Sequence, residues 1–375
     1  MRLALHATLA AMLAARLPPL TPLSFRRPAA VAAALVAALA CGAAHAASFD
    51  CKAAKTPTER AICGSPKLSA LDERLATDYE HAAQGLSPTG AAQLKASQRS
   101  WLRFASRVCA PRDAKRNGAK PAECLEGEYT RRIERLAQVG IRVGPYVFNR
   151  VDFHAATRLK KDDGAGDYAG FATDHVAFAQ IDAPVTPATT AWNAAQRVDP
   201  PSPDTGDDGA ERGGDDNDPA SDNDTDFVIG CAGERFISLS KTSAYFMHGS
   251  AHGGYDHEVR NVVFAPAMRK MTANDVFTAN SGWKARLPGL FWNAYTRDPD
   301  AAKDMPSIKE AILESGANPD RWLLTPEGLQ ISFDADEAGC YACNPGPITV
   351  PWATLKPMLA SPDFANCKAP PPTKH

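Results

Sequence analysis

The chain has 375 residues, which is long enough for two domains. Its formal net charge is −2, and 44% of its residues are hydrophobic. A charge this balanced argues against a general nucleic-acid-binding protein. The 22% content of charged residues is ordinary for a globular protein, and the 30 prolines predict linkers and tails.

The first 46 residues have the pattern of a signal peptide. Arg26 and Arg27 precede an apolar run from Ala29 to Ala40, and Ala44-His45-Ala46 fits a small-x-small cleavage site. The run is too short and too rich in alanine for a membrane span. We therefore expect export, with a periplasmic or secreted mature protein. Cys41 leaves a lipid anchor as the alternative, although the residues before it make a poor lipobox.

Eight cysteines follow the expected cleavage site, four in each half of the mature chain: Cys51, Cys63, Cys109, Cys124, Cys231, Cys340, Cys343 and Cys367. An oxidising compartment favours disulfide bonds among an even number of cysteines. The count supports export independently of the signal sequence.

Residues 47–140 are expected to form a small helical domain. A first long helix begins at Ser65-Pro66, where serine is the N-cap and proline occupies the first helical position. A second is expected from Ser87-Pro88 to Val108 and a third from Ala122 to Leu136, with the polar loop Pro111–Lys120 between them.

The first four cysteines are expected to staple this helical domain. Cys109 would end the second helix and Cys124 would begin the third, so a bridge between them would hold a helical hairpin. We prefer Cys51–Cys63 together with Cys109–Cys124, one of three possible connectivities. Each bridge closes a loop near the length for which a cross-link contributes about 3 kcal/mol.

Cationic residues recur every four positions along the second expected helix: Lys95, Arg99, Arg103 and Arg107. Like charges at this spacing repel each other by about 0.2–0.5 kcal/mol per pair. One interpretation is a solvated face, or one paired with Glu126, Glu128 and Glu134. The other is a contact surface for an acidic partner, such as a cleft lined by carboxylates.

From Ile141 the pattern changes to strands, expected at Val143–Phe153 and Val176–Ile181, in the first part (141–198) of an α+β domain. Residues 199–226 are acidic and nearly free of apolar side chains, so we expect a disordered insertion. A calcium site is the alternative, although no EF-hand loop is present. Another is an acidic arm that attracts a basic protein.

Residues 227–362 complete the α+β domain around an antiparallel sheet, and residues 363–375 form a proline-rich tail. Strands are expected at Phe236–Ser240, Tyr245–His248, Val259–Phe264, Arg321–Leu324, Leu329–Phe333 and Ile348–Val350, and helices at Gly282–Tyr295, Ser307–Ser315 and Trp352–Ala360.

Three groups in this domain raise catalytic alternatives. His248, His252 and His257 suggest zinc, but no helix aligns them as ligands. Cys340 and Cys343 could be a redox pair, or a structural bridge with Cys231 and Cys367 as candidate partners. Asp334, Asp336 and Glu337 could supply a glycosidase acid pair, although adjacent loop acids are usually solvated. We expect no catalytic residue, no metal and no cofactor.

A set of motifs spans about residues 49–138: Phe49-Asp50-Cys51, Thr58–Cys63, Leu71-Asp72 with Tyr79, Gln98–Leu102 with Cys109, and Cys124-Leu125 with Tyr129, Arg132-Ile133 and Leu136. They resemble the N-terminal domain of LprI-type lysozyme inhibitors, which are small envelope domains. The resemblance implies a binding domain that meets lysozyme.

A second set spans about residues 227–360: Tyr245-Phe246 with Gly249–Gly253, Asn274–Phe277, Leu324–Leu329 with Phe333, Tyr341-Ala342 and Ile348–Pro351. These are similar to the C-terminal domain of RsiV-type anti-sigma factors, which implies binding of lysozyme at its substrate cleft. Ser250 stands where that family usually has a second glycine, and Cys340 and Cys343 flank the tyrosine motif.

The resulting prediction is an exported, disulfide-bonded binding protein that inhibits lysozyme, or another wall-degrading enzyme, by occluding its active-site cleft. It is not expected to be an enzyme. The candidate contacts are His252 and Tyr255, in the loop Gly249–Asp256, and Arg99, Arg103 and Arg107 of the helical domain. The alternatives are an envelope sensor or adaptor that binds a cell-wall fragment or partner protein, and a cell-wall hydrolase.

Overall fold

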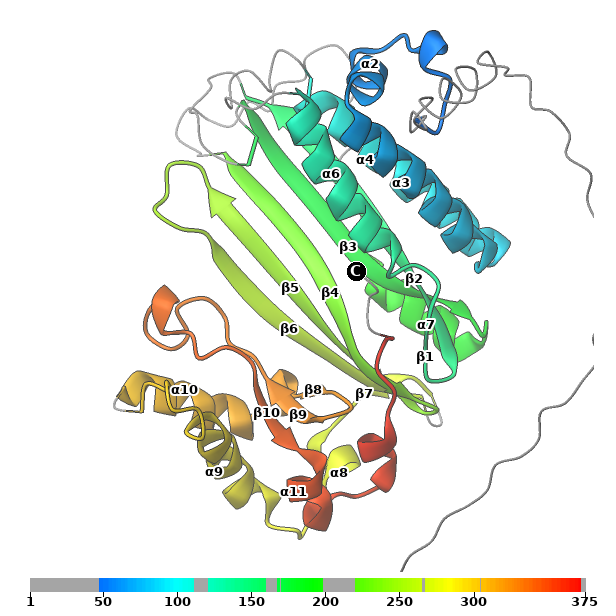
Figure 1. The fold of residues 1–375 in the computed structure, drawn as a ribbon. Coiled ribbons are helices and arrows are strands. Elements are labelled where there is room, and N and C mark those ends of the chain that lie inside the picture. Colours follow the sequence, from blue (N-terminus) through cyan, green and yellow to red (C-terminus); the bar gives the residue numbers. More distant parts are fainter. Residues whose placement is uncertain are drawn as a thin grey trace, which may run out of the picture. The chain divides into compact units, whose positions relative to one another are not determined.

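The structure is a computed structural model that describes residues 47–110, 121–159, 167–168, 170–197, 220–264, 267–303 and 305–371. The predicted signal peptide with Cys41, the predicted loop Pro111–Lys120, and residues 199–219 of the predicted insertion lie outside the described residues. The predicted fold class is confirmed: a disulfide-bonded helical region precedes an α+β arrangement with a mostly antiparallel sheet (Figure 1).

In the described part of the N-terminal region the α-helices are α2 (Pro57–Gly64), α3 (Pro66–Gln84), α4 (Pro88–Val108) and α6 (Pro121–Leu136). The first three begin alike, with a Ser or Thr N-cap followed by proline. The Ser65 hydroxyl accepts from the Leu68 amide at 3.3 Å, and the Ser87 hydroxyl accepts from the Gly90 amide at 3.2 Å. The sequence therefore placed the long helices to within a few residues.

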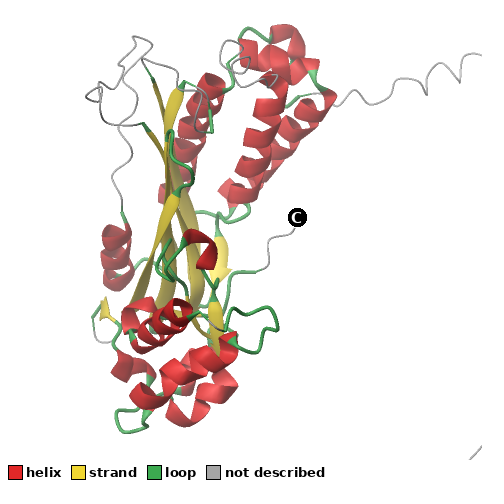
Figure 2. Cartoon of the chain, turned by 90° about the vertical axis from the view of Figure 1, so that its left-hand side faces the viewer, coloured by secondary structure: helices red, strands yellow, loops and turns green. Residues whose placement is uncertain are grey.

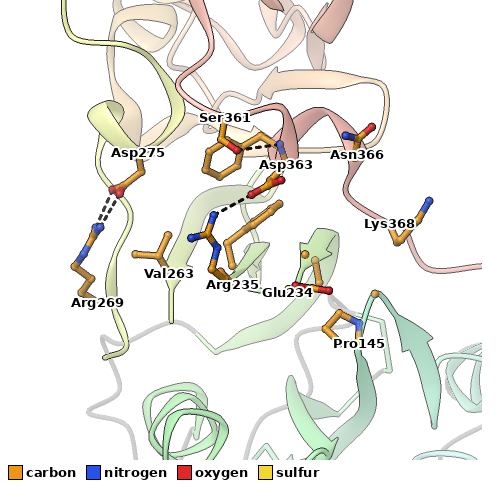
Figure 3. A pocket seen from close by; sticks show the side chains of 15 residues that line it. Pro145, Glu234, Arg235, Val263, Arg269, Asp275, Ser361, Asp363, Asn366 and Lys368 are labelled. Atoms are coloured by element: carbon orange, nitrogen blue, oxygen red, sulfur yellow. Dashed lines mark hydrogen bonds and ion pairs between the residues drawn. The ribbon is translucent and has the colours of Figure 1, made fainter. Parts of the chain in front are cut away.

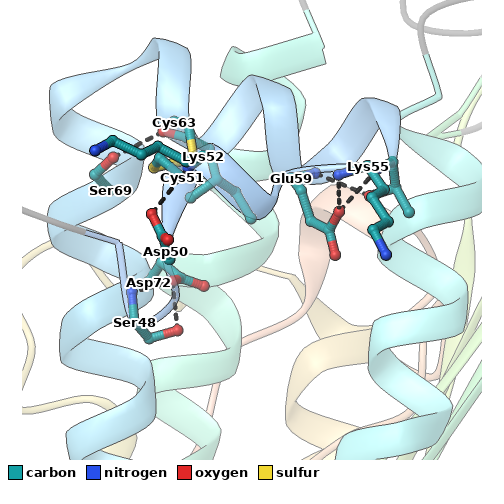
Figure 4. The surroundings of a disulfide bond; sticks show 11 residues. Ser48, Asp50, Cys51, Lys52, Lys55, Glu59, Cys63, Ser69 and Asp72 are labelled. Atoms are coloured by element: carbon teal, nitrogen blue, oxygen red, sulfur yellow. Dashed lines mark hydrogen bonds between the residues drawn. A yellow bond between two sulfur atoms is a disulfide. The ribbon is translucent and has the colours of Figure 1, made fainter.

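Two disulfide bonds close this region as predicted. Cys51–Cys63 joins the short helix η1 (Cys51–Ala53) to α2 (Figure 4). Cys109–Cys124 joins the end of α4 to α6. Beside the first bond, the Asp72 carboxylate accepts from the Ser48 amide at 2.8 Å and from the Tyr129 hydroxyl at 3.0 Å. Asp72 thus ties the start of the described chain to α3 and α6.

A seven-stranded sheet follows in sequence order: β1 (Ile141–Val143), β2 (Tyr146–Arg158), β3 (Phe171–Ala183), β4 (Ser221–Gly233), β5 (Phe236–Met247), β6 (Gly254–Val263) and β7 (Arg269–Lys270). Neighbouring strands are antiparallel except β3 and β4, which are parallel. The chain between these two strands includes α7 (Pro187–Gln196), whose Trp192 packs on Phe148 at 5.8 Å between ring centroids.

Helix α4 covers the open edge of β2. The Asp152 amide donates to the Ser97 hydroxyl at 3.0 Å, and the His154 amide donates to the Ser100 hydroxyl at 2.8 Å. Ser100 in turn donates to the His154 carbonyl at 3.0 Å. Helical side chains thus satisfy strand-edge groups that would otherwise be unpaired or would pair with another chain. The helices therefore lie beside the sheet and share a core with it (Figure 2).

The predicted end of the acidic insertion, at residue 226, is wrong. Residues 221–226, which we predicted to be disordered, are the first half of β4. The composition of this segment favours disorder, but the aspartates at every second position each accept a hydrogen bond from another strand. Asp222 accepts from Thr173, Asp224 from His175 and Asp226 from Arg150. Strand β5 also runs unbroken where two strands were expected.

The C-terminal part contains α8 (Ala273–Val276), α9 (Trp283–Tyr295), α10 (Pro306–Ala317) and η2 (Pro319–Arg321), the three-stranded sheet β8 (Leu323–Leu324), β9 (Gly328–Ile331) and β10 (Ile348–Pro351), and the short helices η3 (Tyr341–Cys343), α11 (Trp352–Leu355), η4 (Lys356–Met358) and η5 (Pro362–Asn366). Trp283 stacks on Phe277, and both rings meet the edge of Trp322, in the core of this part.

Two further predictions change here. The expected last helix Trp352–Ala360 divides into α11 and η4, because Pro357 has no amide hydrogen for helical bonding. The expected tail from residue 363 starts later, since Phe364 is buried, Cys367 is bonded to Cys231, and Lys368 pairs with β4. No helix within the described ranges is long and apolar enough to cross a membrane.

Candidate binding site

The predicted cationic stripe is real but divided. Lys95, Arg99 and Arg103 are exposed on α4, and within the described residues their side chains have no hydrogen-bonding or ionic partner. Leu102 lies among them and is 47% exposed. Arg107 is half-buried, with its guanidinium 5.7 Å from the centre of the Phe171 ring. The candidate contact surface therefore narrows to the face of Arg99, Leu102 and Arg103, hereafter the α4 face.

The nearby glutamates do not neutralise the α4 face. Glu126 pairs with Lys67 at 2.7 Å. Glu128 is buried and pairs with Arg131 and with the Tyr168 hydroxyl. Glu134 is exposed on α6. Glu126 and Glu128, two of the three acids that we considered as partners of the stripe, thus pair with other residues.

His252 and Tyr255 meet at the tip of the β5–β6 hairpin through a third aromatic residue, Tyr341. The His252 ring packs against Tyr341 at a tilt of 30°, with 4.8 Å between centroids, and Tyr255 meets Tyr341 edge to face at 5.9 Å. The Asn344 amide donates to the Tyr255 hydroxyl at 2.7 Å. Burial and the adjacent Tyr341 raise the pKa of Tyr255. This tip cluster is compact and partly exposed.

The glycine-rich motif before Tyr255 has a steric cause. A Cβ atom on Gly253 would lie 2.5 Å from the Tyr245 carbonyl oxygen, and one on Gly254 would lie 2.5 Å from the Tyr245 ring. Only glycine allows the two strands to approach so closely at this point. The motif therefore shapes the hairpin tip and the position of Tyr245.

The sequence analysis missed a buried charge network between the helices and the sheet. Asp152 is fully buried, and its Oδ2 accepts from Arg132 of α6 at 3.0 Å. Its Oδ1 accepts from Arg150 at 2.8 Å and from His175 at 3.2 Å. Burial opposes ionisation of Asp152, but Arg150, His175 and Arg132 outweigh it and hold the pKa of Asp152 well below its usual value.

Two neighbouring histidines, His154 and His175, lie beside this network with their ring centroids 4.6 Å apart. Both ring nitrogens of His175 face carboxylates, those of Asp152 and Asp224, and Arg135 lies 3.3 Å from its Nδ1. Burial opposes protonation, but the hydrogen bonds to the carboxylates raise the pKa of His175. Burial and then the charge of His175 hold the pKa of His154 well below its usual value. Within this pair, the network favours protonation of His175 over that of His154.

A cleft of about 440 Å3 opens above the histidines. Its lining comes from α4, α6, the strands β2 to β6 and η3, and includes Phe104, Arg131, Arg135, His154, His175, Asp224, Phe246, Tyr255 and Tyr341. A signal for this site exists in the sequence. Titratable residues occupy alternate positions of two strands, Arg150, Asp152 and His154 in β2 and Asp222, Asp224 and Asp226 in β4, so each set lies on one face of the sheet.

The zinc alternative finds no shared site for its three histidines. His248 lies beside Asp222, His252 packs against Tyr341, and His257 bonds to the Thr242 hydroxyl. Across the described ranges, no group of three or more His, Cys, Asp or Glu side chains is placed to hold a metal ion.

The residues of the remaining candidate motifs are paired within the fold. Cys340 and Cys343 are bonded to each other, so Cys231 and Cys367 are not their partners. Asp334 and Glu337 both pair with Arg321, at 2.6 and 3.2 Å.

A second hollow, of about 680 Å3, lies where the turn between β4 and β5 meets the C-terminal segment (Figure 3). Arg235 pairs there with Asp363 at 2.9 Å, and Arg269 pairs with Asp275 at 2.6 Å. Because each arginine is already paired with a carboxylate, neither one requires a charged ligand in the hollow.

The fold and the exposed faces define a disulfide-bonded α+β protein with two candidate contact surfaces and one cleft. Residues 51–136 match the model of the family described as "Lysozyme inhibitor LprI". This chain is 32% identical over 90 residues to "Lipoprotein LprI" of Mycobacterium bovis, and equally to that of Mycobacterium tuberculosis H37Rv. The matched part is 24% of this chain and spans 41% of each relative.

A comparison with solved structures found two proteins of the DUF3298 family. One is a DUF3298 family member from Bacteroides fragilis, with a TM-score of 0.39 and 16% identity over 59% of this chain and 97% of that one. The other is a DUF3298 family protein from Pseudomonas aeruginosa, with a TM-score of 0.39 and 14% identity over 59% and 96% of the two chains. The resemblance of residues 227–360 to RsiV-type proteins stays a prediction.

Proposed function

We propose that this protein binds lysozyme and inhibits it by occluding the active-site cleft. The observation that carries the proposal is the α4 face, which lies inside the segment that matches the lysozyme-inhibitor family. Arg99 and Arg103 are exposed there without a counter-charge among the described residues, and Leu102 adds an exposed apolar contact.

The chemistry of lysozyme suits such a surface. Its cleft holds two catalytic carboxyl groups, one of which stays ionised (a worked example of pKa tuning in enzymes). A guanidinium can bind a carboxylate through two parallel hydrogen bonds, and such pairs are stronger than neutral ones. Arg103 or Arg99 at the cleft would exclude substrate, while Leu102 would bury apolar area at the rim.

The hairpin tip is the second proposed contact. Its support is the tip cluster of His252, Tyr255 and Tyr341, together with the resemblance of this region to the lysozyme-binding part of RsiV-type proteins. Aromatic residues held rigid by stacking lose little entropy on binding, so they are favourable anchors at an interface. His252 is exposed and its ring could donate to a carboxylate.

We propose that the mature protein is periplasmic. The support is the signal-peptide pattern of residues 1–46 and the four disulfide bonds of the described chain, which form in oxidising compartments. The curated relatives are named lipoproteins. Cys41 is therefore kept as an alternative membrane anchor.

The test is inhibition of muramidase activity by residues 47–375, with disulfides formed, against c-type, g-type and i-type lysozymes in parallel. We expect near-stoichiometric inhibition of one class, and a loss of at least about tenfold in potency for the variant Arg99→Ala/Arg103→Ala. Arg286→Ala is the matched control, because Arg286 is an exposed arginine of α9.

Three outcomes would decide the proposal. No inhibition and no binding of any lysozyme by calorimetry would overturn it. Full potency of the double arginine variant would remove the α4 face from the mechanism. In that case His252→Ala and Tyr341→Ala would test whether the hairpin tip acts alone.

A further inference from the structure

The disulfide bond Cys340–Cys343 differs from the other bonds of the described chain in what it joins. Its two cysteines are 3 positions apart, whereas the other pairs are separated by 12, 15 and 136 positions. The other bonds connect separate elements of the fold, but this bond connects only the two ends of the turn η3. That turn has its own hydrogen bond, which the Cys343 amide donates to the Cys340 carbonyl at 3.0 Å. Opening this bond therefore leaves the connections between elements intact.

The bond also lies where another molecule can approach it. Cys340 and Cys343 are half-buried, whereas Cys231 is 0% and Cys367 is 6% exposed. Both Cys340 and Cys343 line a hollow of about 330 Å3, together with residues between α9 and α10. A disulfide is opened by a thiolate that must reach one of its sulfur atoms, so access decides which bond reacts. The spacing Cys-x-x-Cys is also that of many thiol–disulfide exchange sites.

Access alone does not single out this bond, because Cys51 of the Cys51–Cys63 bond is exposed as well. The surroundings distinguish the two bonds. Cys51–Cys63 closes the start of the described chain onto α2, whereas the ring of Cys340–Cys343 encloses Tyr341 of the tip cluster. An exchange reaction at Cys340–Cys343 therefore acts on a candidate contact surface.

The ring holds the tip cluster together through the backbone of Tyr341. The Tyr341 side chain is 43% exposed, and its ring centroid lies 4.8 Å from that of His252 and 5.9 Å from that of Tyr255. Asn344, the residue after the ring, donates to the Tyr255 hydroxyl at 2.7 Å. Opening the ring returns conformational freedom to the backbone of the turn, and ordering it again costs entropy. Tyr341 then no longer has a fixed position against the other two side chains.

We propose that Cys340–Cys343 is a thiol–disulfide exchange site for a dithiol reductant, and that its reduction releases Tyr341 from His252 and Tyr255. A thiolate of the reductant attacks one sulfur atom, forms a mixed disulfide and expels the other cysteine as a thiolate, which takes up a proton. The second thiol of the reductant then attacks the mixed disulfide and frees the first cysteine. The reductant leaves as a disulfide, and the protein gains two electrons and two protons as two thiols.

The first test is thiol trapping with dithiothreitol as the dithiol. Residues 47–375 are incubated with it at neutral pH, samples are quenched with acid, and free thiols are alkylated and quantified at each cysteine by mass spectrometry. Cys340 and Cys343 should become alkylated together, at least about tenfold faster than Cys231 and Cys367. Equal rates for the two pairs would overturn the exchange site.

The second test follows His252 in 1H–13C spectra of protein labelled at histidine. The ring current of Tyr341 displaces the His252 signals in the oxidised protein, and reduction should move them toward the position seen in oxidised Tyr341→Ala. The variant Cys340→Ala/Cys343→Ala should show the same shift without any reductant. Cys51→Ala/Cys63→Ala is the matched control, because it opens the other exposed bond and should leave His252 unchanged. His81, exposed on α3, is the reference signal within each sample.

Two further outcomes would contradict the proposal. If His252 keeps its signals after Cys340–Cys343 is reduced, the bond does not position the tip cluster. If opening this bond alone abolishes the circular dichroism of the folded protein, the bond holds the fold and does not serve exchange. Weaker inhibition of lysozyme by the reduced protein is a consequence that rests on the proposed function. Thiol trapping and the histidine spectra use no lysozyme, so their results are independent of the inhibition assay.

Discussion

Replacement of Asp152 by asparagine tests whether the buried network holds the helices to the sheet. Asparagine keeps the shape of the side chain but removes the charge and one acceptor. Asp152 uses Oδ2 for Arg132 and Oδ1 for Arg150 and His175, and it is 0% exposed. Whichever way the new amide turns, its NH2 group faces a donor. Arg132, Arg150 and the ring of His175 then share a buried site without their central anion.

The expected cost is large. Removing one partner of a buried ion pair typically lowers the free energy of unfolding by about 3–5 kcal/mol, because the remaining charges are left uncompensated. The control is Asp363→Asn, which breaks an ion pair of similar length, 2.9 Å, between exposed Arg235 and Asp363. Exposed pairs are worth about 0–1 kcal/mol.

The assay is urea denaturation of residues 47–375 at neutral pH with all disulfides intact, followed by both far-ultraviolet circular dichroism and tryptophan fluorescence. We expect a single transition, shifted strongly by Asp152→Asn and little by Asp363→Asn. If Asp152→Asn costs no more than the control, the network does not stabilise the contact between helices and sheet. If the two probes separate only in Asp152→Asn, the variant has uncoupled the two regions.

Two further predictions concern pH and the disulfides. Because the folded-state pKa of His175 is raised, its contribution to stability is fully present below its usual pKa near 6.5 and is lost as the pH rises through the folded value. The stability difference between wild type and His175→Gln, measured in urea from about pH 6 to 9, should therefore shrink with rising pH; a constant difference would contradict it. Cys231–Cys367 spans 136 residues and Cys340–Cys343 only 3, so replacing each pair by alanine should cost about 5 and about 2 kcal/mol in loop entropy. Equal urea midpoints for the two variants would refute this ranking.

The helical region was predictable because its signals are local. The N-cap and proline at Ser65-Pro66 and at Ser87-Pro88 mark helix starts by backbone chemistry alone. The Cys109–Cys124 bridge followed from the positions of two helix ends. None of these inferences required knowledge of a distant partner.

The sheet was harder to predict because each of its buried polar residues is stabilised by a partner on another strand. Asp222, Asp224 and Asp226 gave their segment the composition of a disordered chain, yet they bond to Thr173, His175 and Arg150 across the fold. Neither the pairing of β3 with β4 nor these contacts can be read from a single segment. Titratable residues at every second position of β2 (Arg150, Asp152, His154) and of β4 (the three aspartates) were the available signal, and composition outweighed it.

The motif residues that carry the resemblance to LprI-type inhibitors mostly point inward. Asp72 and Tyr129 bond to each other, Gln98 accepts from Arg132, and Ser100 bonds to the edge of β2. These contacts build the helical region and fasten it to the sheet, so the motifs report how the region folds and packs. Within the same motif Gln98–Leu102, Arg99 and Leu102 face solvent instead, and Arg103 follows them. The proposed contact with lysozyme uses these exposed side chains, which is why their substitution, rather than loss of an inward-facing motif residue, separates lost binding from lost folding.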